Sequence, residues 1–107
     1  MIIYLAGKYR GTSKCPPINW LQRQLNIYCA RLAAQRLWKE GNITICPHLN
    51  TANFDEESAD FLGGYLRLLA KCDKVVVLPG WNQSQGTIKE IKVAHTLNIP
   101  VEVFSHE

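Results

Sequence analysis

The chain has 107 residues, of which 47% are hydrophobic and 20% charged, proportions typical of a soluble globular protein with one hydrophobic core. We therefore expect a single domain over residues 1–107. The formal net charge is only +3 and the basic residues are scattered, which disfavours a dedicated nucleic-acid-binding protein because such proteins need a concentrated basic surface. No apolar run approaches 18 residues and no basic segment precedes the apolar N-terminus, so we expect no membrane span, no signal peptide and a cytoplasmic location.

The four cysteines include no C-x-x-C pair and no neighbouring histidine doublet. This spacing favours reduced thiols over a zinc site. We therefore expect neither a metal nor a cofactor.

Strands and helices are predicted to alternate along the chain. Short runs rich in β-branched residues and closed by glycine or proline are typical of buried strands, and apolar residues at helical spacing are typical of amphipathic helices. The expected strands cover residues 2–6, 43–46, 75–78 and 101–104, and the expected helices cover residues 18–39, about 57–72 and 87–97. The aromatic residues of the first helix, Trp20, Tyr28 and Trp38, are expected in the core or in a subunit interface.

This alternation predicts an α/β protein, in which right-handed crossovers produce a parallel sheet of about four strands with helices on both faces. Ligands of such sheets bind at the carboxyl ends of the strands. The loops that follow residues 6, 46 and 78 are therefore the expected place for a site.

The loop in "VVVLPGWNQSQGTIKE", residues 75–90, leads into the third expected helix. Ser84 and Gly86 lie where that helix begins, and its unpaired N–H groups would attract a phosphate or carboxylate. Glu90 follows about one turn later. One interpretation is a capping box, with Glu90 folded back on the N–H of Thr87. The other is that Glu90, kept ionised by the helix dipole, acts as a nucleophile.

Polar residues of all three loops would converge at this edge of the sheet. Two cations and a helix N-terminus suit a phosphate monoester, and a nearby carboxylate suits attack on a glycosidic carbon. The set comprises Lys8 and Arg10 in the first loop, His48, Asn50 and Asn53 in the second, and Ser84, Gly86 and Glu90 in the third.

Three segments, "IYLAGKYRG", "CPHLNTANFD" and "CDKVVVLPGWNQSQGTIKEIKVAHTLNIPV", together resemble the nucleoside 2-deoxyribosyltransferase superfamily, in particular a branch of short phage and bacterial proteins. The segments 7–11 and 84–90 are also similar to the "G-x-x-R-G" and "S-x-G-x-x-x-E" motifs of the 2'-deoxynucleoside 5'-monophosphate N-glycosidase. The resemblance implies a three-layer flavodoxin-like or Rossmann-like fold and active sites near a homodimer interface. It also implies that Glu90 is the nucleophile and that Arg10 and Ser84 hold a 5'-phosphate. Gly7 and Gly11 are predicted to belong to the substrate-binding loop, or else to be ordinary turn glycines.

One position departs from the superfamily pattern. These enzymes usually carry an aspartate about eight residues before the "CD" that opens the third strand, where it orients the sugar or assists proton transfer, and here Tyr65 occupies that position. Asp60 is either a substitute on a similar helix face or a solvated residue near the helix start. Three other candidates also have two interpretations. His48 either contacts a base or bonds to backbone, Trp81 either stacks on a base or covers the sheet edge or a dimer interface, and Tyr9 either leans over the sugar or simply flanks the loop.

The sequence thus predicts hydrolysis of an N-glycosidic bond, or deoxyribosyl transfer, on a small-molecule nucleoside or nucleotide by a homodimer or larger homo-oligomer. A protein that binds a nucleotide metabolite without catalysis, or a glycohydrolase of a ribosylated cofactor such as NAD, remains an alternative.

Overall fold

The computed structural model describes residues 1–8, 14–47 and 62–104, and it contains one four-stranded parallel sheet in the order β2-β1-β3-β4. The strands are β1 (Ile2–Ala6), β2 (Ile43–Ile45), β3 (Lys74–Val77) and β4 (Val101–Val103). In the central pair, Tyr4 is aligned with Val75 and Ala6 with Val77. The two central strands are buried on both faces, as their nearly continuous apolar sequence requires.

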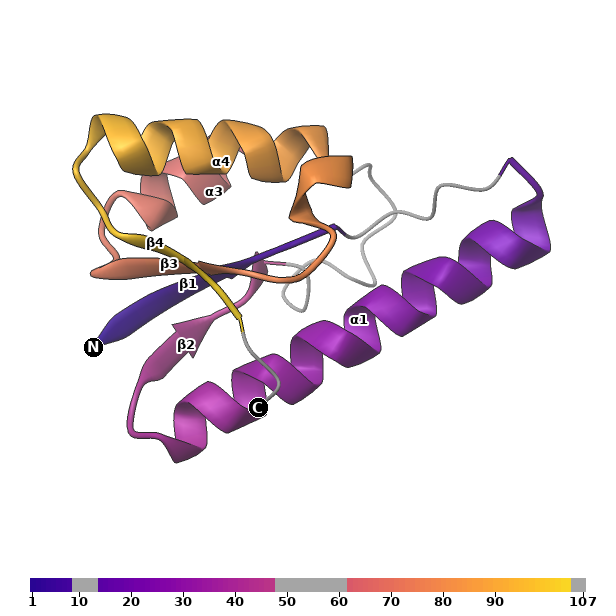
Figure 1. Cartoon of the computed structure of the whole chain (residues 1–107), viewed down its shortest axis with the longest axis horizontal. Helices are drawn as coiled ribbons and strands as arrows, with labels where there is room; N and C mark the ends of the chain where they lie inside the picture. Colours follow the sequence, from indigo (N-terminus) through magenta and orange to yellow (C-terminus); the bar gives the residue numbers. More distant parts are fainter. Residues whose placement is uncertain (9–13, 48–61, 105–107) are drawn as a thin grey trace.

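Helices cover both faces of the sheet (Figure 1). The long helix α1 (Pro16–Lys39) lies on one face, and α3 (Leu62–Leu69) and α4 (Gln85–Thr96) lie together on the other. Each face has its own hydrophobic core. Because side chains alternate along a strand, Ile3 and Leu5 of β1 contribute to the core beneath α1, while Tyr4 and Ala6 contribute to the core beneath α3 and α4.

The predicted α/β architecture is confirmed, and each strand lies within one residue of its expected bounds. Helix α1 begins at Pro16 rather than residue 18, because proline has no N–H and its fixed φ suits the first turn of a helix. Helix α3 ends at Leu69, earlier than the predicted residue 72, and the first residues of the predicted helix lie outside the described part of the chain.

The third predicted helix starts earlier than expected. Helix α4 begins at Gln85, two residues before Thr87, and is preceded by a short 3-10 helix, η2 (Trp81–Gln83), that the sequence analysis missed. Gly80, at φ 88°, forms the N-cap of η2 in the left-handed region that glycine adopts without strain. The polar loop after β3 is therefore a compact helical turn that leads directly into α4.

Within residues 1–8, 14–47 and 62–104, no helix is both long and apolar enough to cross a membrane. All four cysteines belong to this part of the chain and none forms a disulfide, in agreement with the predicted thiols.

Candidate functional site

The strand order places a topological switch point between β1 and β3. The chain leaves β1 toward α1 on one face of the sheet and leaves β3 toward α4 on the other. At such a point the two outgoing loops separate and leave a crevice at the carboxyl ends of the strands, which is where open α/β sheets bind ligands. The loops after Ala6 and Val77 therefore form the expected rim of a site.

These two loops are in close contact. Gly7 packs so tightly against Leu78 that a Cβ atom at Gly7 would lie 2.9 Å from the Leu78 Cβ. Beyond this contact, the Lys8 Nζ donates a hydrogen bond to the Gln83 Oε1 at 3.0 Å, and the Lys8 side chain passes beside Gly80. The structure therefore places a lysine ammonium group at the end of η2, just before α4 begins.

Glu90 is a buried carboxyl group at this end of the molecule. It lies in the second turn of α4 and is only 6% exposed. Burial raises the pKa of Glu90 from 4.5 to about 7, and the neighbouring Tyr4 hydroxyl partly offsets this by lowering the pKa. A carboxyl group with such a pKa exchanges its proton near neutral pH, which is the property expected of a catalytic acid, base or nucleophile.

Tyr4 brings a phenol group from β1 to the same place. Its side chain is fully buried, and its pKa is raised first by burial and then by the adjacent Glu90 carboxyl group. Within the described residues no group meets strict hydrogen-bonding geometry with the Tyr4 hydroxyl. Burying a hydroxyl group without a hydrogen-bond partner costs free energy. Among the side chains, the Glu90 carboxyl group has the largest effect on the pKa of Tyr4, so it is the expected acceptor for this hydroxyl.

Tyr65 of α3 belongs to the same cluster. It packs against the core beneath α3 and α4, and it contributes to the raised pKa of Tyr4. Its hydroxyl donates to the carbonyl oxygen of Pro47, just after β2, at 3.4 Å. The cluster therefore joins β1, α3, α4 and the end of β2 around one buried carboxyl group.

The N-terminus of α4 is capped by Ser84. The Ser84 Oγ accepts a hydrogen bond from the Thr87 N–H at 3.2 Å, and a serine hydroxyl also carries one hydrogen that it can donate. The predicted capping box between Thr87 and Glu90 is therefore wrong. Because α4 begins before Thr87, that residue lies inside the first turn and Glu90 in the second, where its side chain is buried instead of folded back on the helix end.

The predicted effect of the helix dipole on Glu90 is also wrong. The dipole acts mainly within the first turn of a helix, whereas Glu90 is one turn further on. Burial dominates at that depth and raises the pKa of Glu90 instead of keeping it low.

Several of the predicted site residues lie in the described part of the chain and come together in the structure. They are Gly7, Lys8, Tyr65, Trp81, Ser84, Gly86 and Glu90. Of these, Trp81 is half-buried against the core beneath α3 and α4. The other predicted residues, Tyr9, Arg10, Gly11, His48, Asn50, Asn53 and Asp60, lie outside the described residues.

The role of Tyr4 was not predicted from the sequence. The available signal was a single hydroxyl group within the apolar strand "IIYLA", because a buried polar atom in a strand needs a partner from a neighbouring element.

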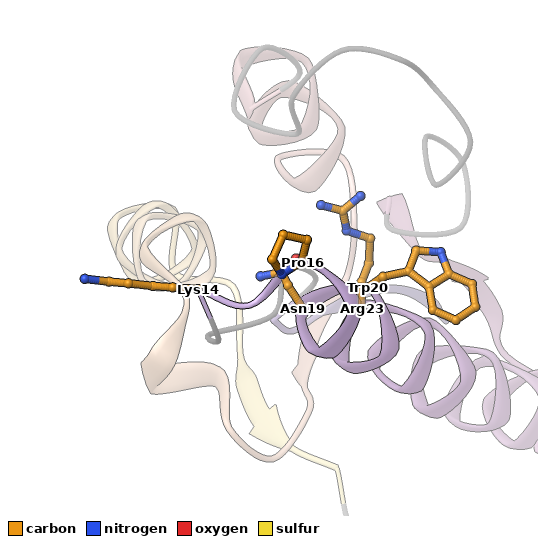
Figure 2. A pocket seen from close by; sticks show the side chains of 5 residues that line it. All are labelled: Lys14, Pro16, Asn19, Trp20 and Arg23. Carbon is orange, nitrogen blue, oxygen red and sulfur yellow. The ribbon is translucent and has the colours of Figure 1, made fainter.

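A hollow lies at the start of α1, with a volume of about 390 Å³, and it is lined by Lys14, Pro16, Asn19, Trp20 and Arg23. Figure 2 shows that the long side chains of Lys14, Trp20 and Arg23 point in different directions instead of converging on one point. Their arrangement is less suited to holding a small ligand than the cluster around Glu90. Trp20, Tyr28 and Trp38 are all exposed on α1, so their predicted place in the core is wrong and only the subunit interface remains a prediction for them.

Fold and site together define a parallel α/β protein with a titratable carboxyl group buried beside the switch point of its sheet. The chain belongs to the family described as "Domain of unknown function (DUF4406)", which matches residues 1–103.

Among solved structures, the chain is similar to a 2-deoxyribosyltransferase from the psychrotolerant bacterium Bacillus psychrosaccharolyticus. The TM-score is 0.65 at 19% sequence identity, over 98% of this chain and 72% of that one. This likeness shows a shared Rossmann-like fold, in agreement with the predicted architecture. No curated protein matches the sequence.

Proposed function

We propose that the protein breaks the N-glycosidic bond of a 2'-deoxynucleoside or of its 5'-monophosphate, with Glu90 as the nucleophile. The observation that carries this proposal is the burial of Glu90 beside Tyr4 of the central strand β1, with a pKa of about 7. The fold shared with a 2-deoxyribosyltransferase supports the same class of reaction.

In the first step, the Glu90 carboxylate attacks C1' of the sugar. The new C1'–O bond forms as the C1'–N bond breaks, and the base departs with the electron pair of that bond and takes up a proton. The developing positive charge on the sugar ring is stabilised by the carboxylate. In the second step, water or another base attacks C1', Glu90 leaves as a carboxylate, and the attacking molecule releases a proton to solvent. Water gives a hydrolase, and a second base gives a transferase.

Tyr4 acts as a positioning residue in this scheme. Its hydroxyl lowers the pKa of the Glu90 carboxyl group, because a hydrogen-bond donor favours the charged form. A nucleophile must be ionised, so the reaction rate should increase as the pH rises through about 7.

The 5'-phosphate of a nucleotide, or the 5'-hydroxyl of a nucleoside, would lie across the loops after β1 and β3. Ser84 offers a hydroxyl hydrogen and a helix N-terminus, while Lys8 offers an ammonium group whose described partner is the exposed side chain of Gln83. Such a combination suits a phosphate or a sugar hydroxyl. Arg10, which the superfamily resemblance assigns to the 5'-phosphate, would add a second cation.

Ligand binding without catalysis is the second candidate, and Tyr65 is the observation that favours it. The superfamily resemblance expects an acid at this position, and a tyrosine whose hydroxyl donates to the Pro47 carbonyl oxygen is a poor proton donor for a departing base. The protein would then bind a nucleotide in the same crevice without breaking it.

A substrate panel separates the candidates. The protein is incubated with the four 2'-deoxynucleosides, their 5'-monophosphates and NAD, each with and without a second free base, and the products are resolved by liquid chromatography. Free base alone indicates hydrolysis, an exchanged base indicates transfer, and binding without product supports the second candidate. If Glu90→Ala cleaves as fast as the parent protein, the nucleophilic role of Glu90 is wrong.

A further inference from the structure

Thr87 carries a buried hydroxyl group on the same face of α4 as Glu90. The buried residues of this helix are Thr87, Glu90 and Ala94, and Ala94 belongs to the core beneath α3 and α4. Thr87 is only 1% exposed. Among the residues that the structure describes, none forms a hydrogen bond with the Thr87 Oγ1. Because burying a hydroxyl group without a partner costs free energy, we expect this hydroxyl to have an acceptor close by.

The start of α4 explains why the backbone does not supply this acceptor. A threonine inside a helix can donate to the carbonyl oxygen four residues earlier, and Thr96 does so to the Lys92 carbonyl oxygen at 2.9 Å. For Thr87 the corresponding residue is Gln83, which belongs to η2 and precedes α4. The change from a 3-10 helix to an α-helix therefore leaves the Thr87 hydroxyl hydrogen for a side-chain acceptor.

Glu90 is in the right place to be that acceptor. Residues three apart on a helix are neighbours, with Cβ atoms about 5–6 Å apart, and helical side chains lean toward the N-terminus. The Glu90 carboxyl group is therefore directed back over the turn that contains Thr87. Tyr4 approaches the same carboxyl group from β1. A carboxylate has two oxygens with about four acceptor sites, so it can accept from both hydroxyls and keep an acceptor site for a ligand.

The surroundings of Glu90 offer it no cation within the described part of the chain. Tyr65 of α3 and Cys46 after β2 act on Tyr4, and η2 has no ionisable side chain. Lys74 of β3 forms an ion pair with Glu102 of β4. The remaining ionisable residues of α3 and α4 are exposed, which are Arg67, Lys89, Lys92 and His95. The ionised form of Glu90 therefore depends on neutral hydrogen-bond donors.

We propose that Thr87 is a positioning residue, whose hydroxyl donates a hydrogen bond to the ionised Glu90 carboxylate and, together with Tyr4, fixes the orientation of the nucleophile. The bond forms with the carboxylate because a charged acceptor binds a hydroxyl about twice as strongly as a neutral one. The effect on catalysis rests on the proposed function, whereas the contact itself can be tested without a substrate.

Titration of Glu90 by nuclear magnetic resonance tests the contact. The full chain is labelled with ¹³C at the glutamate carboxyl groups, and the Glu90 signal is the one that Glu90→Gln lacks. Thr87→Val replaces the hydroxyl by a methyl group, so the midpoint of the Glu90 titration should rise by about one pH unit. Thr87→Ala removes the same hydroxyl and should give the same rise. Thr87→Ser restores the hydroxyl and should return the midpoint close to that of the parent.

Thr44→Val is a matched control. Thr44 is also buried, and its Oγ1 has no hydrogen-bond partner among the described residues. It is aligned with Ile3, whose side chain belongs to the core beneath α1, so it lies on the opposite face of the sheet from Glu90. Thr44→Val should leave the Glu90 midpoint unchanged. An unshifted midpoint in Thr87→Val and Thr87→Ala, or an equal shift in Thr44→Val, would overturn the proposal.

The pH–rate profile tests the effect on catalysis. With the best substrate of the panel, Thr87→Val should move the midpoint of kcat upward by the same amount as the titration, which lowers kcat about fivefold at pH 7, and KM should change little. Cleavage by Thr87→Val with the parent's profile would overturn the positioning role. A shifted titration without cleavage by the parent would instead confirm the contact and contradict the proposed function alone.

Discussion

Replacing Glu90 by glutamine should abolish the pH dependence that this buried group imposes on the free energy of unfolding. Glutamine keeps the shape of the side chain and a hydrogen-bond acceptor but cannot ionise. In the parent protein, burial of Glu90 disfavours the carboxylate. The folded state therefore holds its proton more tightly than the unfolded state, and the free energy of unfolding decreases as the pH rises from about 4.5 to about 7.

The magnitude follows from the change in pKa. A rise from 4.5 to about 7 corresponds to about 3 kcal/mol, since each pKa unit is worth about 1.4 kcal/mol. The parent protein loses this amount between acid and neutral pH, and Glu90→Gln does not. The free energy of unfolding of the variant, relative to that of the parent, should therefore increase by about 3 kcal/mol across this range.

Urea unfolding at several pH values between 4 and 8 measures this difference, with the three tryptophans as fluorescent probes. Comparison at each pH cancels the contributions of other groups, including the Cys72 thiol, whose pKa is raised by burial. Glu40→Gln is a matched control, because Glu40 is exposed at the end of α1 and its substitution should leave the slope unchanged. A constant difference between Glu90→Gln and the parent would refute the reasoning, since it would mean that Glu90 is not desolvated.

Three other substitutions test the contacts around the site. Tyr4→Phe removes the hydroxyl that lowers the pKa of Glu90, so the pH at which the stability of the protein changes should move upward in the same urea experiment. Gly7→Ala should lower the free energy of unfolding by about 1–3 kcal/mol, because the new Cβ would lie 2.9 Å from the Leu78 Cβ. A Cβ at Gly64 in α3 would meet open space, so Gly64→Ala should raise the free energy of unfolding by about 0.5–1 kcal/mol. Thermal melts should therefore show a lower midpoint for Gly7→Ala and a higher one for Gly64→Ala than for the parent.

The sequence was sufficient to predict the strands and the long helix. β1 and β3 are nearly continuous apolar runs, and α1 has prolines only in its first turn and no glycine before its end. The start of α4 could not be predicted from the sequence, because both Ser84 and Thr87 are good N-cap residues. The structure buries Thr87 and leaves Ser84 as the N-cap. Burial depends on tertiary packing, which the local sequence does not show.

The partner of Glu90 could not be predicted either. Tyr4 lies far away in the sequence, and the two meet only because β1 is central in the sheet and α4 covers the face toward which Tyr4 points. The sequence pattern indicates alternating strands and helices, but it does not determine strand order. The same packing buries Glu90 and raises its pKa, whereas its position near a helix N-terminus, taken alone, predicts a lowered pKa.

The most direct test of the proposed function is to detect a sugar bound to Glu90. The parent protein and Glu90→Gln are mixed with the best substrate of the panel, quenched in acid within one turnover, digested and analysed by mass spectrometry. The parent should carry a deoxyribosyl ester, or its 5'-phosphate, on the peptide that contains Glu90, and Glu90→Gln should carry none. Base release by the parent with no adduct on Glu90, together with equal release by Glu90→Gln, would contradict the nucleophilic role of this residue.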